Sequence, residues 1–255
     1  MAAFLKGLGA LPLLITYLFT SGILSILPMH GRSRRAMRMQ NTSFFSKLAL
    51  ALFGFRVQVK HHERLHNARG GRLLVSNHLS YADVLVISAF SPAVFITSVE
   101  LKHTVLLGIL ARFGGSLFVE RRKPTGLKKE IAGIARILDQ GFPVVLFPEG
   151  TTSNGDRVQQ FKNSLFDSAV STGVDVQPLC LRYVRVNGEL VTAQNRDAVF
   201  YYGGTTFFRH FPRFLSLKSV EVDVIPLKAI KVHASISRKE LAKLAHDAID
   251  RAYHA

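Results

Sequence analysis

The sequence predicts an α/β fold, a mixed and largely parallel sheet flanked by helices, with an N-terminal apolar helical segment that docks on a membrane. Three observations lead to this prediction. From residue 56 onward, short apolar runs alternate with helix-like stretches, which is the pattern of strands joined by helices. The first 55 residues instead contain two long and almost uncharged stretches. Polar motifs directly follow several predicted strands, at the edge where open α/β sheets bind ligands.

The chain of 255 residues divides on this basis into a membrane-associated helical segment, residues 1–55, and a single globular domain, residues 56–255. Hydrophobic residues make up 48% of the chain, which is enough to bury a sizeable core. The single cysteine, Cys180, excludes an internal disulfide, and its apolar neighbours indicate a small core residue.

The first apolar stretch, Gly7 to Pro28, carries no charge and could span a bilayer as a helix, because about 20 apolar residues suffice. The basic cluster that follows it would face the cytoplasm by the positive-inside rule; it contains Arg32, Arg34, Arg35 and Arg38. A cleaved signal peptide fits less well, since the apolar run is long and its main positive cluster lies on the wrong side.

The second apolar stretch, Phe44 to Phe55, has Lys47 as its only charge. It predicts a helix that lies in the membrane interface, packs against the first helix, or belongs to the core. A spanning helix and a helix pair embedded in one leaflet both remain open.

The charge balance demands an anionic partner. The chain has 33 Lys and Arg against 17 Asp and Glu, a net charge of +16. Nucleic acid, an acidic membrane surface and a phosphorylated substrate would all satisfy this excess. No nucleic-acid-binding module is recognisable, and the apolar N-terminus favours the membrane. We therefore expect an anionic membrane surface as a partner and no nucleic acid.

The elements expected in the globular domain follow from periodicity and from helix stop and start signals. Strands are expected at 56–60, 72–76, 93–97, 116–119, 142–147, 176–183 and 220–225. Helices are expected at 82–89, 103–113, 124–140 and 163–172, with a last helix after the capping box of Ser237 and Glu240. The stretch 205–217 interleaves phenylalanine with arginine, which suits either a membrane-surface helix or a helix packed on the core.

The residues that suggest chemistry are His78 and Asp83, at the turn between a predicted buried strand and a predicted helix. A carboxylate beside a histidine fixes the imidazole tautomer and stabilises the imidazolium, so the pair could act as a general base. No serine, nor Cys180, is placed as an obvious covalent nucleophile. His62 and His66 have the i, i+4 spacing of a metal pair, but their polar surroundings favour an exposed connection. We therefore expect no metal and no cofactor.

Four boxes at strand ends give the sequence a resemblance to the glycerolipid acyltransferase family that includes 1-acylglycerol-3-phosphate acyltransferase. His78 and Asp83 match a His-x4-Asp box, and Gly115 with Phe118, Val119 and Arg121 matches a Gly-x-x-Phe-Val-x-Arg box. The run 147–151 reads Phe-Pro-Glu-Gly-Thr, a third box, and Pro178 matches a proline-containing fourth box. The resemblance covers roughly residues 57–226, and the set of four is specific.

The resemblance implies an O-acyltransferase domain at 56–255, in which a lysolipid hydroxyl attacks the thioester of acyl-CoA or acyl-carrier protein. His78 would take the hydroxyl proton and Asp83 would orient His78. Backbone amides near Gly150 would stabilise the oxyanion. The implied substrate-binding residues are Arg121, Glu149, Gly150, Thr151, Thr152 and Lys162, with Arg121 on the acceptor phosphate. Glu149 would bind a substrate hydroxyl or hold its loop together.

The acceptor implied first is 1-acylglycerol-3-phosphate, which would give phosphatidate. Members that form phosphatidate usually read Glu-Gly-Thr-Arg-Ser, whereas Thr152 stands here at the arginine position. This threonine and the run 200–203, Phe-Tyr-Tyr-Gly, are similar to the lyso-ornithine lipid acyltransferase branch, which is the alternative. A non-catalytic lipid-binding membrane protein is a remote third possibility. The expected location is the cytoplasmic face of a bacterial inner membrane.

Overall fold

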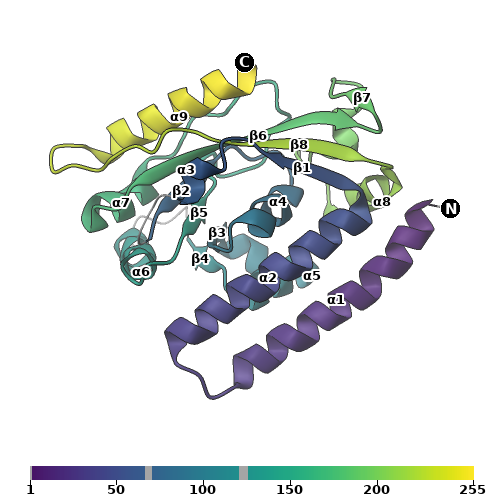
Figure 1. Ribbon diagram of the computed structural model, residues 1–255, viewed down its shortest axis with the longest axis horizontal. Coiled ribbons are helices and arrows are strands. Elements are labelled where there is room, and N and C mark those ends of the chain that lie inside the picture. Colours follow the sequence, from purple (N-terminus) through teal and green to yellow (C-terminus); the bar gives the residue numbers. More distant parts are fainter. Residues whose placement is uncertain (1, 67–70, 121–125) are drawn as a thin grey trace.

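The computed structural model describes residues 2–66, 71–120 and 126–255 (Figure 1). A mixed sheet forms its centre, in the order β1-β8-β6-β2-β5-β3-β4, with β7 paired to β6. The strands are β1 (Phe55–Val59), β2 (Leu73–Ser76), β3 (Val94–Ser98), β4 (Leu117–Val119), β5 (Val144–Leu146), β6 (Val176–Val186), β7 (Glu189–Leu190) and β8 (Val220–Pro226).

The helices are α1 (Ala2–Ile26), α2 (Gly31–Phe53), α3 (Glu63–His66), α4 (Ala82–Phe90), α5 (Val105–Phe113), α6 (Leu127–Asp139), α7 (Asp167–Thr172), α8 (Phe207–Ser216) and α9 (Arg238–His254). Short 3₁₀ turns η1 (Val99–His103), η3 (Ser164–Phe166) and η4 (Arg196–Ala198) connect some of them. One of the two bonds of the expected capping box is formed, since the Ser237 hydroxyl accepts from the Glu240 amide at 3.2 Å.

Five neighbouring strands of the sheet run parallel, β6, β2, β5, β3 and β4. β8 is antiparallel to β6, and β1 is parallel to β8, so the first and last strands form a reversed edge. The prediction of a mixed, largely parallel sheet is therefore confirmed. The carboxyl ends of the parallel strands lie at one edge of the sheet, and the His78 motif follows β2 at that edge.

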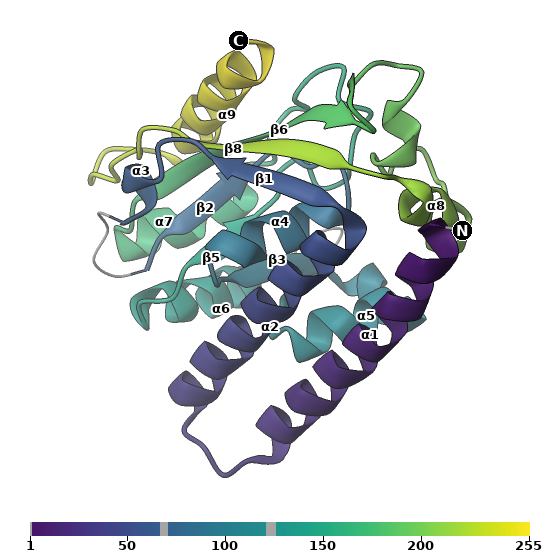
Figure 2. The ribbon, with the colours of Figure 1, turned by 45° about the vertical axis from the view of Figure 1, so that its right-hand side comes forward.

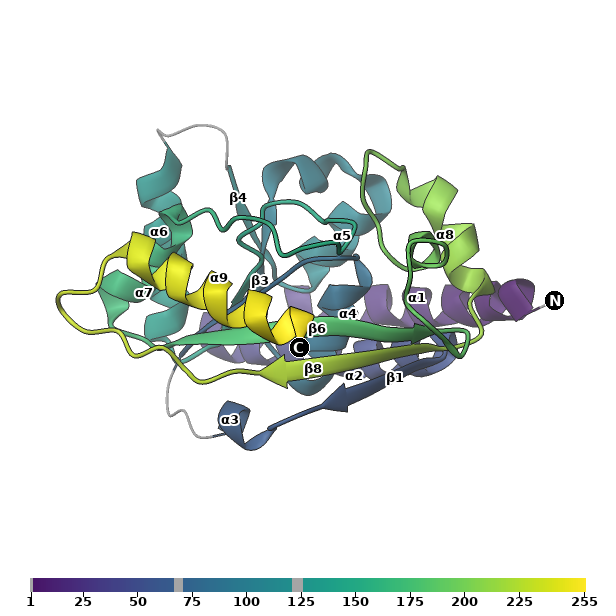
Figure 3. The same ribbon diagram turned by 90° about the horizontal axis from the view of Figure 1, so that it is seen from above.

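Two apolar cores lie on opposite faces of the sheet, because side chains alternate along each strand. Leu74 and Leu181 join the core beneath α2, α4 and α8. Leu73 and Cys180 join the core beneath α6, α7 and α9. Figure 3 shows α9 crossing one side of the sheet, with α1 and α2 on the other. Cys180 is fully buried, as its apolar neighbours indicate.

The N-terminal segment forms an antiparallel helical hairpin, in which α2 lies between α1 and the globular domain (Figure 2). The second helix begins at Gly31, and not at Phe44 as the sequence suggested. The basic cluster, which the sequence analysis placed beside a spanning helix, forms the first turns of α2. The Arg35 guanidinium lies 5.8 Å from the centre of the Phe142 ring, so this part of α2 also packs on the domain.

Contacts along the whole length of α1 hold it to α2. A Cβ at Gly9 would lie 2.9 Å from Leu52, so the two helices approach closely there. Polar contacts between these helices include Lys6 Nζ to Phe53 O at 2.7 Å, Tyr17 Oη to Thr42 Oγ1 at 3.3 Å, Asn41 Nδ2 to Ser21 Oγ at 2.9 Å, and Arg38 Nη2 to Ser25 Oγ at 2.6 Å. Lys6 also donates to Leu217 O at 2.6 Å, and thereby joins α1 to the carboxyl ends of both α2 and α8.

The outer face of α1 is apolar and exposed. Its most apolar stretch has a mean hydropathy of 1.7, and by length and composition alone the helix could cross a membrane. Its most exposed side chains are Phe4, Leu5, Leu8, Leu11, Ile15, Phe19 and Ile26. Such a continuous and exposed apolar stripe is typical of a membrane-facing surface.

Helix α8 turns most of its aromatic side chains toward the protein. Phe207 and Phe214 are buried, and Phe214 packs on Phe53 with ring centroids 5.4 Å apart. Phe208 is 74% exposed, and Arg209 is exposed beside it. The helix therefore packs on the core through one face and presents one phenylalanine and its arginines to the outside.

Candidate active site

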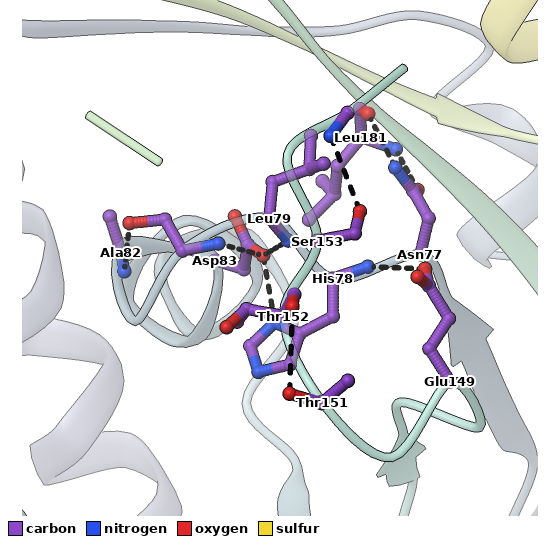
Figure 4. Close-up of polar contacts among 12 residues, drawn as sticks. Asn77, His78, Leu79, Ala82, Asp83, Glu149, Thr151, Thr152, Ser153 and Leu181 are labelled. Carbon is purple, nitrogen blue, oxygen red and sulfur yellow. Dashed lines mark hydrogen bonds and ion pairs between the residues drawn. The ribbon is translucent and has the colours of Figure 1, made fainter. Parts of the chain in front are cut away.

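The site is built on the loop that leaves β2 and enters α4. Asn77 begins it by bridging to β6 with both ends of its side-chain amide (Figure 4). Its Nδ2 donates to Leu181 O at 2.9 Å, and its Oδ1 accepts from Leu181 N at 2.8 Å. The amide thus continues the β2–β6 pairing by one step after β2 has ended, and it fixes the backbone just before His78.

His78 and Asp83 are in direct contact. His78 Nδ1 lies 2.8 Å from Asp83 Oδ2, so an ionised Asp83 accepts the Nδ1–H bond. The same oxygen accepts from the amides of Leu79 at 2.7 Å and Ser80 at 3.0 Å. Asp83 is fully buried in the first turn of α4, where the helix dipole favours a carboxylate. These contacts leave Nε2 as the imidazole nitrogen that could accept a proton.

The His78 ring is held on one face by Phe147. The two rings are stacked, with centroids 4.0 Å apart and planes 13° from parallel. The His78 side chain is 19% exposed, whereas Phe147 is buried. The ring therefore has a fixed plane and a fixed tautomer, and part of it remains open to a ligand.

Glu149, from the third box, supports the same backbone. Its Oε1 accepts from the His78 amide at 2.8 Å, and its Oε2 accepts from the Gln159 amide at 3.3 Å. Both oxygens are thus engaged with the main chain, and the residue is 4% exposed. Of the two roles the sequence allowed, this geometry supports the one in which Glu149 holds the loop together.

Burial raises the pKa of Glu149 to about 8, although the two amide bonds act in the opposite direction and Asp83 adds a further increase. The folded protein therefore holds this carboxyl protonated in a range where the unfolded chain ionises it. The resulting contribution to stability is fully present below the ordinary pKa of 4.5 and is lost as the pH rises through about 8.

We expect the wild-type protein to lose stability between pH 4.5 and pH 8, by roughly 3–5 kcal/mol from this group. Glu149→Gln should flatten that dependence, because the amide does not ionise. Thermal unfolding in detergent at pH 5 and pH 8 measures the slope. Glu189→Gln, at an exposed position on β7, is the control and should keep the wild-type slope. A slope unchanged in Glu149→Gln would contradict this account.

The third-box loop runs beside His78. The Ser153 amide donates to His78 O at 3.0 Å, which places Thr151 and Thr152 next to the imidazole (Figure 4). Thr151 is exposed and Thr152 is half-buried. Gly150 has φ +78°, a conformation that favours glycine, and its amide donates to Phe147 O at 3.2 Å. That amide is therefore already used within the turn.

Lys162 lies over the same turn. Its amide donates to Pro148 O at 2.9 Å, and its Nζ would be 2.8 Å from a Cβ at Gly150. The structure thus brings five of the six predicted substrate-binding residues to one loop region beside His78. The sixth, Arg121, lies outside the described residues, and its contact with a phosphate remains a prediction. Within the described residues, no group of His, Cys, Asp and Glu could hold a metal ion.

Sequence reasoning missed Tyr183, whose hydroxyl donates to Asp83 Oδ1 at 2.6 Å from strand β6. It also missed the bond between Tyr81 and His210 of α8, 3.0 Å long, inside the His-x4-Asp turn. Tyr183 looks like an ordinary strand residue, and Tyr81 looks like a spacer within the His-x4-Asp box. Their partners are 100 and 129 residues away, so no local signal could have found them.

Comparison with known proteins agrees with this geometry. Residues 56–182 match the family model described as Acyltransferase. A lyso-ornithine lipid O-acyltransferase of Rhizobium meliloti is 36% identical over 205 residues, which cover 78% of this chain and 69% of that protein. The chain belongs to the acyltransferase family. This acyltransferase is therefore an enzyme that transfers an acyl group to oxygen, and the possibility of a non-catalytic relative falls away.

Two further relatives bear on the acceptor. A lyso-ornithine lipid O-acyltransferase of Brucella abortus is 32% identical, covering 86% of this acyltransferase and 85% of that protein. A 1-acyl-sn-glycerol-3-phosphate acyltransferase of Neisseria gonorrhoeae is 33% identical, but over only 47% of each chain. The crystal structure of the 1-acyl-sn-glycerophosphate acyltransferase PlsC of Thermotoga maritima shares the fold, with a TM-score of 0.67 and 21% identity over 98% of this chain and 96% of that one.

Proposed function

We propose that this acyltransferase moves an acyl chain from an acyl thioester to the free hydroxyl of lyso-ornithine lipid. The observation that carries the proposal is Thr152 in the third-box loop, together with relatives of that name that match most of the chain. The turn from Glu149 to Asp156 has the Thr152 hydroxyl at the arginine position, and the Lys162 ammonium lies over the turn. Ornithine presents an ammonium and a carboxylate in place of a phosphate, so a loop without a guanidinium suits it better.

The mechanism assigned to the site is direct transfer. His78 Nε2 takes the proton of the acceptor hydroxyl while that oxygen attacks the thioester carbonyl. Asp83 stabilises the imidazolium, which then returns its proton to the thiolate as the tetrahedral intermediate collapses. The products are the acylated lipid and a free thiol. Acyl-CoA and acyl-carrier protein would both supply the thioester, and the assay must offer each.

The decisive assay compares the two acceptors with the purified enzyme. We expect a higher kcat/KM for lyso-ornithine lipid than for 1-acylglycerol-3-phosphate in the same mixed micelles, with product formation followed by mass spectrometry. A preference for the phosphate acceptor would overturn the proposed acceptor but leave the acyl transfer intact.

Thr152→Arg is expected to shift the preference toward 1-acylglycerol-3-phosphate. A guanidinium can hold a phosphate through two hydrogen bonds, and charge-assisted bonds contribute about 1.5–3 kcal/mol each. The ratio of the two kcat/KM values should therefore change by roughly 10- to 100-fold, since 1.4 kcal/mol corresponds to a factor of ten. Ser171→Arg on α7 adds the same charge at an exposed hydroxyl position and should leave the ratio unchanged. An equal ratio in both variants would argue against Thr152 as a determinant of the acceptor.

We also propose that α1 lies in the plane of the membrane and does not span it. One end of α1 is tied to the globular domain by Lys6 to Leu217, and the other end is tied to α2 by Arg38 to Ser25. Between these ends α1 packs on α2, and α2 packs on α4. A spanning α1 would have to leave these contacts. The exposed stripe of α1 would instead enter one leaflet, with the arginines of α2 near anionic head groups.

A cysteine placed near the N-terminus tests this arrangement, because the native Cys180 is buried. We expect Ala3→Cys to react with a membrane-impermeant maleimide from the same side as His233→Cys, an exposed position in the globular domain. On the proposed cytoplasmic face, both would react in inverted vesicles and neither in intact spheroplasts. Reaction of Ala3→Cys from the opposite side would show that α1 spans.

A further inference from the structure

Strand β6 places a tyrosine hydroxyl on the far side of the Asp83 carboxylate from His78. Tyr183 Oη lies 2.6 Å from Asp83 Oδ1, and His78 Nδ1 lies 2.8 Å from Asp83 Oδ2. The three side chains form a continuous line of hydrogen bonds from the buried core to the open imidazole. We propose that Tyr183 is a positioning residue for acyl transfer, which fixes the orientation of Asp83 through a hydrogen bond. This proposal rests on the assignment of His78 as the base.

The two oxygens of Asp83 are not in equivalent surroundings. Oδ2 has three donors, from His78, Leu79 and Ser80, whereas Tyr183 is the donor that the described residues supply to Oδ1. Asp83 has no exposed surface and Tyr183 is 5% exposed, so bulk water does not substitute for the phenol. A buried carboxylate oxygen without a donor strongly disfavours ionisation. Tyr183 therefore supplies the hydrogen bond that this buried oxygen requires.

The phenol is well suited to act as a permanent donor. Burial raises the pKa of Tyr183 well above its usual value, and the negative charge of Asp83 raises it further. The hydroxyl thus stays protonated throughout the range in which the enzyme works. The ring is held edge-on by Phe200, with centroids 5.3 Å apart and planes at 79°.

The same strand holds the catalytic loop at a second point. Leu181 and Tyr183 are two residues apart on β6, so they share one face of the sheet. The backbone N–H and C=O of Leu181 form hydrogen bonds with the Asn77 side chain, and the Tyr183 hydroxyl donates a hydrogen bond to Asp83. The residue before His78 and the residue that orients His78 are therefore fixed by a single strand. This double attachment gives the hydroxyl a positional role in addition to satisfying its own hydrogen bond.

Tyr183→Phe removes the hydroxyl and keeps the ring. We expect kcat to fall about tenfold with KM little changed, because the acceptor and the thioester do not touch Tyr183. The acidic limb of the kcat/KM profile should move up by roughly 0.5–1 pH unit. The direction follows from the loss of a donor, which makes Asp83 more basic and stabilises the protonated imidazole. His78 is then protonated, and inactive as a base, at a higher pH.

Other titratable groups face this pair, and the variant leaves all of them in place. Glu149 accepts the His78 amide, Tyr253 lies near Asp83 and Glu149, and Tyr81 and Cys180 adjoin these tyrosines. A shift measured in Tyr183→Phe is therefore assigned by difference to the lost hydroxyl. Tyr17→Phe is the matched control, since Tyr17 is a buried tyrosine on α1 whose hydroxyl contacts Thr42 at 3.3 Å. It should keep the wild-type kcat and pH profile.

The pKa of His78 itself, followed by nuclear magnetic resonance of the imidazole, provides a readout that does not depend on turnover. An increase in Tyr183→Phe but not in Tyr17→Phe is the expected result. A lower melting temperature with an unchanged His78 pKa and an unchanged pH profile would overturn the proposal and leave Tyr183 a core residue. If His78→Ala retains full activity, the assignment of the base fails instead, whereas the pKa comparison still decides whether Tyr183 acts on His78.

Discussion

His78→Ala is expected to abolish measurable acyl transfer, with kcat reduced roughly 10²- to 10⁴-fold, the usual contribution of a general base. The hydroxyl acceptor is a weak nucleophile at neutral pH, and Nε2 of His78 is the ring nitrogen that Asp83 leaves available. The fold should survive the change. Asp83 keeps the amide bonds from Leu79 and Ser80, and the loop keeps its attachment to Glu149 through a backbone atom.

The assay should follow both the released thiol and the acylated lipid, because slow thioester hydrolysis releases thiol without transfer. His246→Ala is a close control. His246 lies 3.3 Å from Asp247, contacts the Phe161 ring edge-on and is 25% exposed, against 19% for His78. It should retain wild-type turnover. Equal lipid product from His78→Ala and wild type would remove the base from the mechanism.

Asp83→Asn is expected to lower kcat by roughly 10²- to 10⁴-fold while the protein remains folded. The asparagine oxygen can still accept from His78 and the two loop amides, and its NH₂ can donate to Tyr183, since a hydroxyl also accepts hydrogen bonds. The variant therefore preserves the contacts but loses the negative charge that stabilises the imidazolium. KM for either substrate should change little, because Asp83 is fully buried.

Asp83→Ala gives the matched comparison. It leaves the loop amides and the Tyr183 hydroxyl without an acceptor, each at a cost of about 1–3 kcal/mol. We expect a large fall in melting temperature for Asp83→Ala and a small one for Asp83→Asn, with similar losses of kcat. Full activity in Asp83→Asn would show that the geometry of the pair matters and its charge does not.

The sequence predicted where the motifs of the candidate site lie better than it predicted the start of the second N-terminal helix, and the reason is physical. The first box follows β2 and the third box follows β5, and the parallel strands of one sheet bring their carboxyl ends together whatever the intervening loops do. Pro178 of the fourth box lies instead near the beginning of β6. The start of α2 depended instead on contacts made far along the chain. Arg35 packs on Phe142 and Arg38 approaches Gly115, so an arginine-rich run that resembles a polar flank is a helix held to the domain.

The reversed edge of the sheet shows the same limit. The residues of β1 and β8 alternate as strand residues should, but alternation does not encode which strand is the partner or in which direction it runs. The hydrogen bond of the Tyr183 hydroxyl could not be predicted from the sequence for a related reason. In an apolar strand a tyrosine predicts a core ring, and only the fold reveals that its hydroxyl meets a carboxylate 100 residues earlier.

The bond from Lys6 to Leu217 has a consequence for the order of events during synthesis. It joins residues 211 positions apart, and the pairing of β1 with β8 likewise waits for residues 220–224. Helix α1 can therefore meet α2 soon after both are made, but it acquires its bond to the end of α8 late, because domains made from the N-terminus onward complete such contacts late. For most of translation α1 is an apolar helix without its final partner. A membrane can receive it in that interval, and the finished domain then closes onto a helix that is already in place.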